Sequence, residues 1–331
     1  MHQPIFDGDL YKASSIFSRS ILKSNENPIS WNFRKIICFR GIFLTNINLY
    51  LSMHWQIWLL IAITIYLLVS LLLYFIQEWI IFRPEKLSKH FKYKFDYPFE
   101  EYFFEPEKGV SINGLHFKLP QSKGVVFYFK GNSRSIKGWS KFARDFLGKG
   151  YDIFMIDYRG FGKSIGKRSE AGIIRDAQFV YDFLKSKYPE EKITIYGRSI
   201  GSGFATKIAS ENNPNRLILD SPYFSFLHLM RRYLPIFPVS KILKYHIRTD
   251  LYINEVSCPI FIIHGTRDWQ IPFSNSKKLA KKSSRVILIP IEDASHNNLP
   301  RFAAYHDHLY AILHNVTRAY SYNGGQESSY L

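Results

Sequence analysis

The stretch YGRSIGSG contains the residue with the clearest chemical potential in this sequence, a serine in the pattern Gly-x-Ser-x-Gly. A serine hydroxyl becomes a strong nucleophile when a neighbouring base removes its proton and a third group orients that base. An apolar run, 193–196, precedes the motif, and a helix-like run follows it. A strand-to-helix turn of this kind, with glycines where side chains would clash, presents a nucleophilic serine. The pattern predicts that Ser199 is a catalytic nucleophile.

The two partners that this serine needs are expected downstream, first an acid and then a histidine. Asp268 follows the apolar run CPIFIIHG, and His296 follows RVILIPIE. Both are expected at the carboxyl ends of strands, where they could meet the serine. Asp220, at the end of RLILD, is the alternative acid. We predict a triad of Ser199, Asp268 and His296 rather than loop residues that cap helices.

The negative charge that develops on a substrate oxygen needs backbone N–H donors, usually two. One is the amide after the nucleophile, that of Ile200, and the other comes from the loop after the first parallel strand. That loop reads KGNS. Asn132 is the predicted second donor, and Ser133 is the alternative.

The elements that must position these residues alternate along the chain. Beyond residue 123, short apolar runs and amphipathic runs follow one another, which predicts an α/β fold: a mostly parallel sheet with helices on both faces. Before them, FKYKF, EYFFE and VSINGLHFKL are predicted strands, the last a hairpin with Asn113 and Gly114 in its turn. The aromatic, basic segment at about 222–250 is either an inserted cap of short helices or a long crossover.

A membrane segment precedes the globular part. Residues 57–76 run for twenty residues without a charge, enough to cross the hydrocarbon layer of about 30 Å as a helix. Aromatic residues near both ends suit the interface, so 55–78 is predicted as one transmembrane helix. No small residues follow, as a cleaved signal peptide would need. More lysines and arginines lie downstream than upstream, which predicts a single-pass protein with a cytoplasmic C-terminal domain.

The ends of the chain are expected to lie outside the globular domain. Residues 1–52 show no periodic element, and Met53 stands directly before the apolar run. This extension is of doubtful status, because translation starting at Met53 would leave it out. The globular domain is expected at 83–320, and a polar tail at 321–331.

Composition limits which partners and cofactors are expected for this chain. The chain has 44 basic and 27 acidic residues, a net charge of +17 that favours anionic lipid or acidic substrates unless it reflects coding bias. Nucleic acid is not expected, because no helix-turn-helix, zinc-finger, RNP or KH signature is present. Only Cys258 lies in the globular part, so no internal disulfide is expected there. No metal is expected, since His306 and His308 cannot share a helix face and no carboxylate completes a ligand set.

Five blocks of the sequence resemble the α/β-hydrolase superfamily, in this order: FYFKGNS, IDYRGFGKS, YGRSIGSG, PIFIIHGTRDWQIP and ASHNN. The resemblance is greatest to the membrane-anchored branch, which includes bud-emergence-type hydrolases and depalmitoylase-like serine hydrolases. It implies an eight-stranded sheet, no metal, no cofactor and an acyl-enzyme formed on Ser199. Lys130 stands where such hydrolases usually have histidine, and Lys130, Tyr158 and Arg159 are candidates for substrate binding.

These features together predict a membrane-anchored serine hydrolase that cleaves an acyl ester or thioester. A lipid-linked substrate is expected, because the anchor, the basic domain and the aromatic cap would all lie near the bilayer. Two alternatives stay open: a peptidase of the same fold, and a non-catalytic module for membrane interaction.

Overall fold

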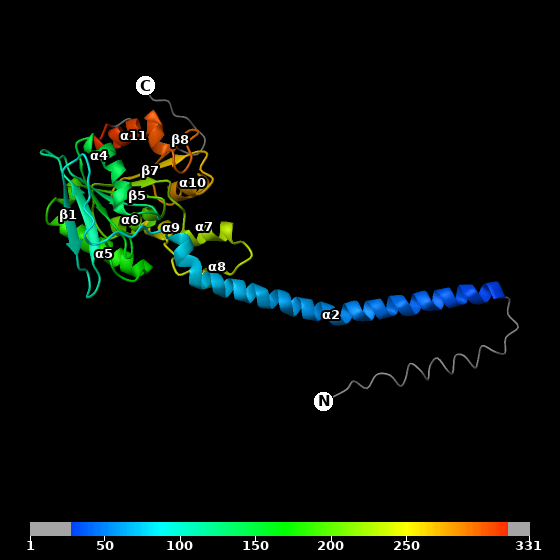
Figure 1. Cartoon of the computed structure of the whole chain (residues 1–331). Coiled ribbons are helices and arrows are strands. Elements are labelled where there is room, and N and C mark those ends of the chain that lie inside the picture. The colour runs from blue at the N-terminus through cyan, green and yellow to red at the C-terminus, as the bar shows by residue number, and fades with distance from the viewer. Residues whose placement is uncertain (1–27, 317–331) are drawn as a thin grey trace, which may run out of the picture. The chain divides into compact units, whose positions relative to one another are not determined.

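The computed structural model describes residues 28–316, whose elements are labelled in Figure 1. The chain divides into two compact units, 1–69 and 70–331, and the last turns of helix α2 (Pro28–Ile81) belong to the second. Within the described residues, the part of α2 from His54 to Ile81 is long and apolar enough to cross a membrane, and 6% of its most apolar window is buried. Of the predicted extension 1–52, the part up to residue 27 lies outside the described residues, as does the polar tail. Residues 28–52 belong to α2, so the expectation that they form no regular element is wrong.

The second unit is built on one eight-stranded sheet, in the order β1-β2-β4-β3-β5-β6-β7-β8. Strand β2 is antiparallel to β1 and β4, and all other neighbours are parallel. The α/β prediction with a mostly parallel sheet is therefore confirmed. The strands are β1 (Phe99–Phe104), β2 (Ile112–Phe117), β3 (Val125–Phe129), β4 (Asp152–Ile156), β5 (Ile193–Arg198), β6 (Arg216–Asp220), β7 (Ile260–Gly265) and β8 (Val286–Ile291).

Helices cover both faces of the sheet (Figure 1), which explains why the central strands are buried along their whole length and mostly apolar. One core contains side chains of α5 (Glu170–Lys185) and α6 (Ile200–Ser210). The other core contains side chains of α4 (Ala143–Leu147) and α11 (Ala303–Leu313). The remaining elements of these layers are α3 (Ile136–Trp139), α10 (Ser274–Ala280) and 3₁₀ turns at Ser140–Phe142, Glu190–Lys192 and Leu299–Arg301.

Three short helices lie between β6 and β7, in or at the end of the segment 222–250 that is called the cap below. They are α7 (Phe226–Tyr233), α8 (Val239–Ile242) and α9 (Thr249–Tyr252). Near the end of α2, the Gln77 side chain donates from Nε2 to Ile242 O and accepts from the Lys244 amide, both at 2.8 Å. The cap is thereby fixed to the last turns of α2.

The hairpin predicted at Asn113 and Gly114 is wrong. Strand β2 runs through both residues, and the chain reverses from β1 in the loop 105–111. The local turn preference is overridden by burial, because the Asn113 side chain accepts from the Tyr93 hydroxyl at 2.9 Å and donates to Glu101 at 2.7 Å. The predicted strand FKYKF is also wrong. This segment is not paired in the sheet, and its rings pack on the second core instead.

Candidate active site

Strand β5 ends in a sharp turn at Ser199, and α6 begins at the next residue. Ser199 has φ 53° and ψ −123°, a conformation that residues with a side chain rarely adopt. Glycines make room for it. A Cβ on Gly197 would lie 2.5 Å from that of Ala205, and one on Gly201 would lie 2.5 Å from Lys130 O. The turn holds Ser199 half-buried at the carboxyl end of β5, so that its hydroxyl can be reached.

Ser199, His296 and Asp268 form one hydrogen-bonded chain. Ser199 Oγ donates to His296 Nε2 at 3.0 Å, and His296 Nδ1 donates to Asp268 Oδ2 at 2.7 Å. The three residues come from loops after β5, β8 and β7, respectively. Burial would raise the pKa of Asp268, but hydrogen bonds from His264, His296 and the Ile271 amide hold that pKa well below its usual range. The charged carboxylate fixes the imidazole in the tautomer whose Nε2 can take the serine proton.

A second histidine, His264 at the end of β7, supports the acid and was not predicted. Its Nε2 lies 3.1 Å from Asp268 Oδ2 and 2.8 Å from Ile271 O, two acceptors, so this nitrogen carries the proton. Its Nδ1 accepts from the Ser276 hydroxyl at 2.5 Å. The sequence signal was a histidine four residues before the acid, at the end of a buried apolar run.

Two backbone amides are available beside Ser199. Ile200 is the first residue of α6, so its N–H has no acceptor within the helix. The loop after β3 approaches from the other side, because a Cβ on Gly131 would lie 4.0 Å from Ser199 Cβ. The next amide, that of Asn132, has no backbone acceptor among the described residues. Ser133, the alternative, accepts at its carbonyl from Trp139 Nε1 at 2.7 Å.

Asp220, the alternative acid, belongs to a different network. It accepts from the Tyr196 hydroxyl at 2.8 Å and from Ser221 Oγ at 3.0 Å, and its carboxylate lies 3.5 Å from Arg198 Nε. Arg198 in turn donates from Nη2 to His296 O at 3.2 Å. Asp220 therefore supports the loop of His296 indirectly, and Asp268 alone of the two acids bonds the imidazole.

The assignment of Lys130 to substrate binding is corrected, because its side chain is fully buried. Lys130 Nζ donates to Arg134 O at 3.1 Å and lies 3.6 Å from Asp157 Oδ1 and 3.7 Å from the centre of the Phe161 ring. Burial lowers the pKa of Lys130 and raises the pKa of Asp157, since each charge loses water. The buried pair of Lys130 and Asp157 thus supports the loop after β3 from the protein interior.

Tyr158 and Arg159 are corrected for the same reason. Both side chains are buried, and both have internal partners. The Tyr158 hydroxyl donates to Lys130 O at 2.8 Å. Arg159 forms a two-bond pair with Asp176, with both distances 2.7 Å, and contacts Glu107 at 2.6 Å. These side chains hold the loop 157–166 in place and do not face a substrate.

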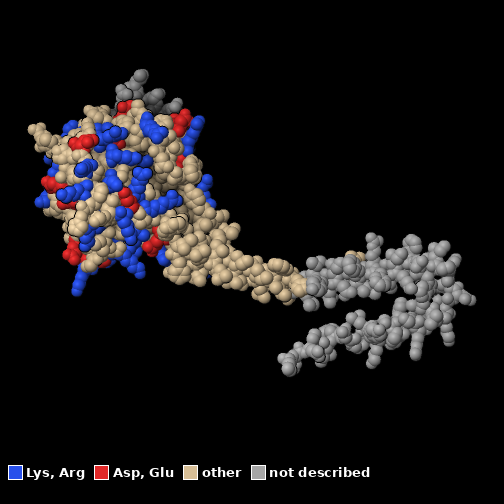
Figure 2. Space-filling view, in the orientation of Figure 1, with Lys and Arg blue, Asp and Glu red and all other residues tan. Residues whose placement is uncertain are grey.

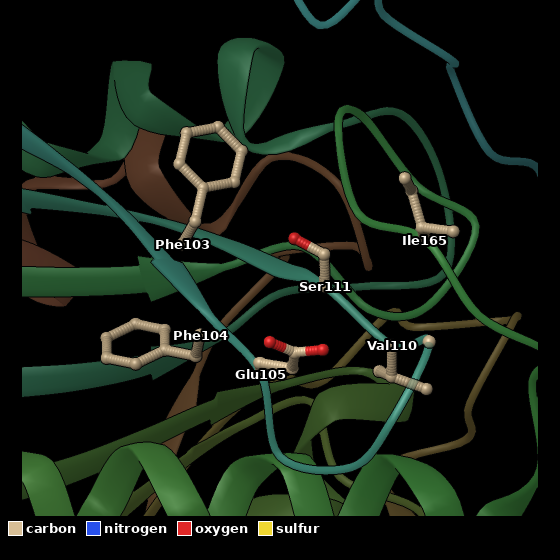
Figure 3. Close-up of a pocket in the computed structure, with 7 residues that line it drawn as sticks. Phe103, Phe104, Glu105, Val110, Ser111 and Ile165 are labelled. Carbon is tan, nitrogen blue, oxygen red and sulfur yellow. The ribbon is translucent and has the colours of Figure 1, made fainter.

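A hollow of about 340 Å³ lies at the antiparallel edge of the sheet (Figure 3). It is lined by Phe103, Phe104, Glu105, Gly109, Val110, Ser111 and Ile165. None of the candidate catalytic residues lines it, so it is separate from the site described above. Among the residues that the structure describes, no three His, Cys, Asp or Glu side chains are grouped as ligands of a metal ion would be.

Comparison with known proteins gives one family match and several named relatives. A family model described as serine aminopeptidase, S33, matches residues 120–249. The lysophosphatidylserine lipase ABHD12 of Danio rerio is 29% identical over 217 residues, which is 54% of this chain and 57% of that protein. The protein of the same name from Xenopus tropicalis is 30% identical over 217 residues, 54% of this chain and 56% of its own. The chain thus spans little more than half the length of these relatives.

A solved structure shows the same fold. An esterase of Pyrococcus furiosus superposes with a TM-score of 0.57 at 22% identity, over 71% of this chain and 98% of that chain. The family match, the named relatives and this fold together make the chain a member of the α/β-hydrolase superfamily. The predicted superfamily is therefore confirmed. In this α/β hydrolase the family match includes Asn132 and Ser199 and ends before Asp268 and His296. The assignment of Asp268 and His296 therefore rests on their hydrogen bonds.

Proposed function

We propose that the chain is a membrane-anchored serine hydrolase that cleaves an acyl ester or thioester. The observation that carries this proposal is the bonded chain of Ser199, His296 and Asp268, with the serine in a strained turn at a helix start. Strain of this kind is retained where it serves a function, and a strained, accessible serine has no purpose in a purely structural module.

The reaction follows from these positions. His296 Nε2 takes the hydroxyl proton while Ser199 Oγ bonds to the acyl carbon, and the carbonyl electrons move to oxygen. The amides of Ile200 and Asn132 would stabilise that oxyanion. When it collapses, the bond to the alcohol or thiol breaks and His296 returns the proton to the leaving group. Water, activated by His296 in the same way, then cleaves the acyl-enzyme and releases the acid.

The substrate class that we propose is a lipid-linked acyl ester or thioester. The helix from His54 to Ile81 could place the domain at a bilayer, and the relatives named above are called lysophosphatidylserine lipases. On the face shown in Figure 2, Lys and Arg outnumber Asp and Glu and are spread over the globular part. An acyl chain on an anionic head group would suit this surface.

The end of α7 is the part of the cap that suits a membrane surface. Tyr233 is 47% exposed and Ile236 is 72% exposed, and Arg231 and Arg232 beside them are also exposed. The Tyr233 hydroxyl donates to Gln270 O at 2.6 Å, which brings α7 to the loop of the catalytic acid. Apolar tips flanked by arginines favour an anionic interface.

This lipid preference is tested with the full chain in nanodiscs of phosphatidylcholine with and without phosphatidylserine. The double variant Arg231→Glu, Arg232→Glu should lose several-fold turnover of a long-chain lipid ester in the anionic discs. A double variant of equal charge change at and just after the end of α5, Lys185→Glu with Lys187→Glu, should keep its turnover. Equal turnover of short soluble esters and long acyl lipids by the wild type would contradict the lipid preference.

A fluorophosphonate probe tests the enzyme itself. Full-length protein in detergent should be labelled, and Ser199→Ala should abolish labelling. Ser210→Ala, at the opposite end of α6 and outside the site, should keep it. Folded wild-type protein that does not label would favour the alternative of a non-catalytic membrane module.

A peptidase is the second candidate, because the matched family model is described as a serine aminopeptidase. Parallel assays with an acyl ester, an acyl thioester and an aminoacyl anilide discriminate the two. Faster turnover of the anilide would replace the esterase proposal.

We also propose that the hydrolase domain is cytoplasmic, on the side of the anchor that is richer in Lys and Arg. A glycosylation acceptor placed in the C-terminal tail should stay unmodified, and modification would reverse the orientation.

A further inference from the structure

The anchor helix continues directly into a short segment, 82–85, that pairs with the loop carrying the Asn132 amide. After α2 ends, the Arg83 amide donates to Asn132 O at 2.9 Å, and the Arg134 amide donates to Arg83 O at 3.0 Å. These bonds pair residues 83 and 133 as a parallel bridge. The Asn132 side chain adds a third bond, donating from Nδ2 to Ile81 O at 2.7 Å.

Glu85 holds the same loop at its far end. Its Oε2 accepts from Ser135 Oγ at 2.7 Å and from the Ser135 amide at 3.3 Å, and its Oε1 lies 3.2 Å from Lys137 Nζ. The segment itself is fixed in the domain, because Gly162 N donates to Glu85 O at 2.7 Å. Phe82 is fully buried against rings of the first core. The segment 81–85 is therefore a rigid part of the hydrolase domain.

Two polar groups of Asn132 are bonded to the segment 81–85, and a third, its backbone N–H, is not. Its carbonyl and its side-chain amide are both bonded to 81–83, whereas its backbone N–H has no backbone acceptor among the described residues. The preceding glycine places this part of the loop beside Ser199. We propose that the segment 81–85 is a positioning element for the oxyanion hole: it holds Asn132 so that the backbone N–H stays available to the substrate oxygen.

This inference rests on the proposed function and adds to it a role for residues that touch no substrate. An oxyanion donor contributes only when it is held within a few tenths of an ångström of the productive position. A segment that merely connected anchor and domain would not affect this position. A positioning segment should affect the chemical step, and substrate binding should change little.

The test uses the full chain in detergent and a short soluble ester, with turnover expressed per active site after complete titration with fluorophosphonate. Glu85→Ala and Asn132→Ala should each lower kcat about 10-fold, less than the 10²–10³ that a deleted donor costs. KM should change less than two-fold, and the pH profile should keep its shape because His296 is untouched. Glu85→Gln should keep most activity, since its amide oxygen can still accept from Ser135.

The matched control is Glu78→Ala. Glu78 is another acid of the same region, with its carboxylate 3.8 Å from a lysine, Lys244, and no bond from its side chain to the loop of Asn132. It should behave as wild type. If Glu85→Ala and Asn132→Ala keep kcat within two-fold per titrated site, or change only KM, the positioning role is refuted. A wild-type chain that neither labels nor hydrolyses esters would refute the proposed function instead.

Discussion

At Ser199, a glycine should give a more stable protein than an alanine, because the backbone there is strained for any residue with a Cβ. Its φ of 53° and ψ of −123° cost on the order of 1–3 kcal/mol for a residue with a Cβ. Glycine adopts this conformation without strain, but loses about 0.5–1 kcal/mol more than alanine through the entropy of the unfolded chain. Ser199→Gly should therefore be more stable than Ser199→Ala by about 1 kcal/mol, which is roughly 2–4 °C in Tm for a domain of this size. Both variants should be inactive.

Thermal unfolding of the full chain in detergent, followed by near-ultraviolet circular dichroism, compares the two. The control pair is Lys207→Gly and Lys207→Ala, in the last turn of α6, where the order should reverse by about 1 kcal/mol because the backbone there is helical. Ser199→Gly melting at or below Ser199→Ala, while the Lys207 pair behaves as expected, would refute the idea that strain is stored at the nucleophile.

Three further changes follow from the same contacts. Asp268→Asn should lower turnover about 10³–10⁴-fold. It should also flatten the loss of stability in urea titrations between about pH 5 and pH 3, because the folded pKa of Asp268 is depressed and its stabilisation, present above the unfolded pKa, is lost on acidification. Lys130→Met should cost about 3–5 kcal/mol in thermal unfolding by leaving Asp157 buried without a cation, and adding Asp157→Asn should recover part of it; wild-type stability of the single variant would contradict this. Gly201→Ala should lower both Tm and kcat, since its Cβ would collide with backbone oxygens at the end of β3 and push Ile200 away. An unchanged kcat would contradict this, because the loop after β3 would then have moved without displacing Ile200.

The candidate triad could be predicted because chain order and strand ends together limit the choices. Ser199, Asp268 and His296 each follow a short apolar run, and parallel strands bring their carboxyl ends to one edge. His264 could not be found in this way. A histidine within a buried strand has the pattern of a core residue, and its role depends on a contact across the β7 loop that periodicity does not report.

The errors arose where tertiary contacts override local preference. Asn113 and Gly114 favour a tight turn by type, yet the Asn113 side chain is used by partners on β1 and in the segment before it. Lys130 was a candidate for substrate binding because it stands in the loop of the predicted oxyanion donors, and its burial was not foreseen because lysine is rarely buried. Its partner Asp157 follows β4, and only the pairing of β3 with β4 brings the two charges together.

The bonds of Gln77 to the cap also limit how far this enzyme could reach. A flexible spacer lets an attached domain sweep a volume whose radius grows with the square root of the spacer length. Between Gln77 and Glu85 the chain is hydrogen-bonded to the rest of the domain at four residues, so it contains no flexible spacer. These residues are Gln77, Ile81, Arg83 and Glu85. If the proposed anchor spans a bilayer, the domain would contact other membrane-bound molecules only as far as its own dimensions reach.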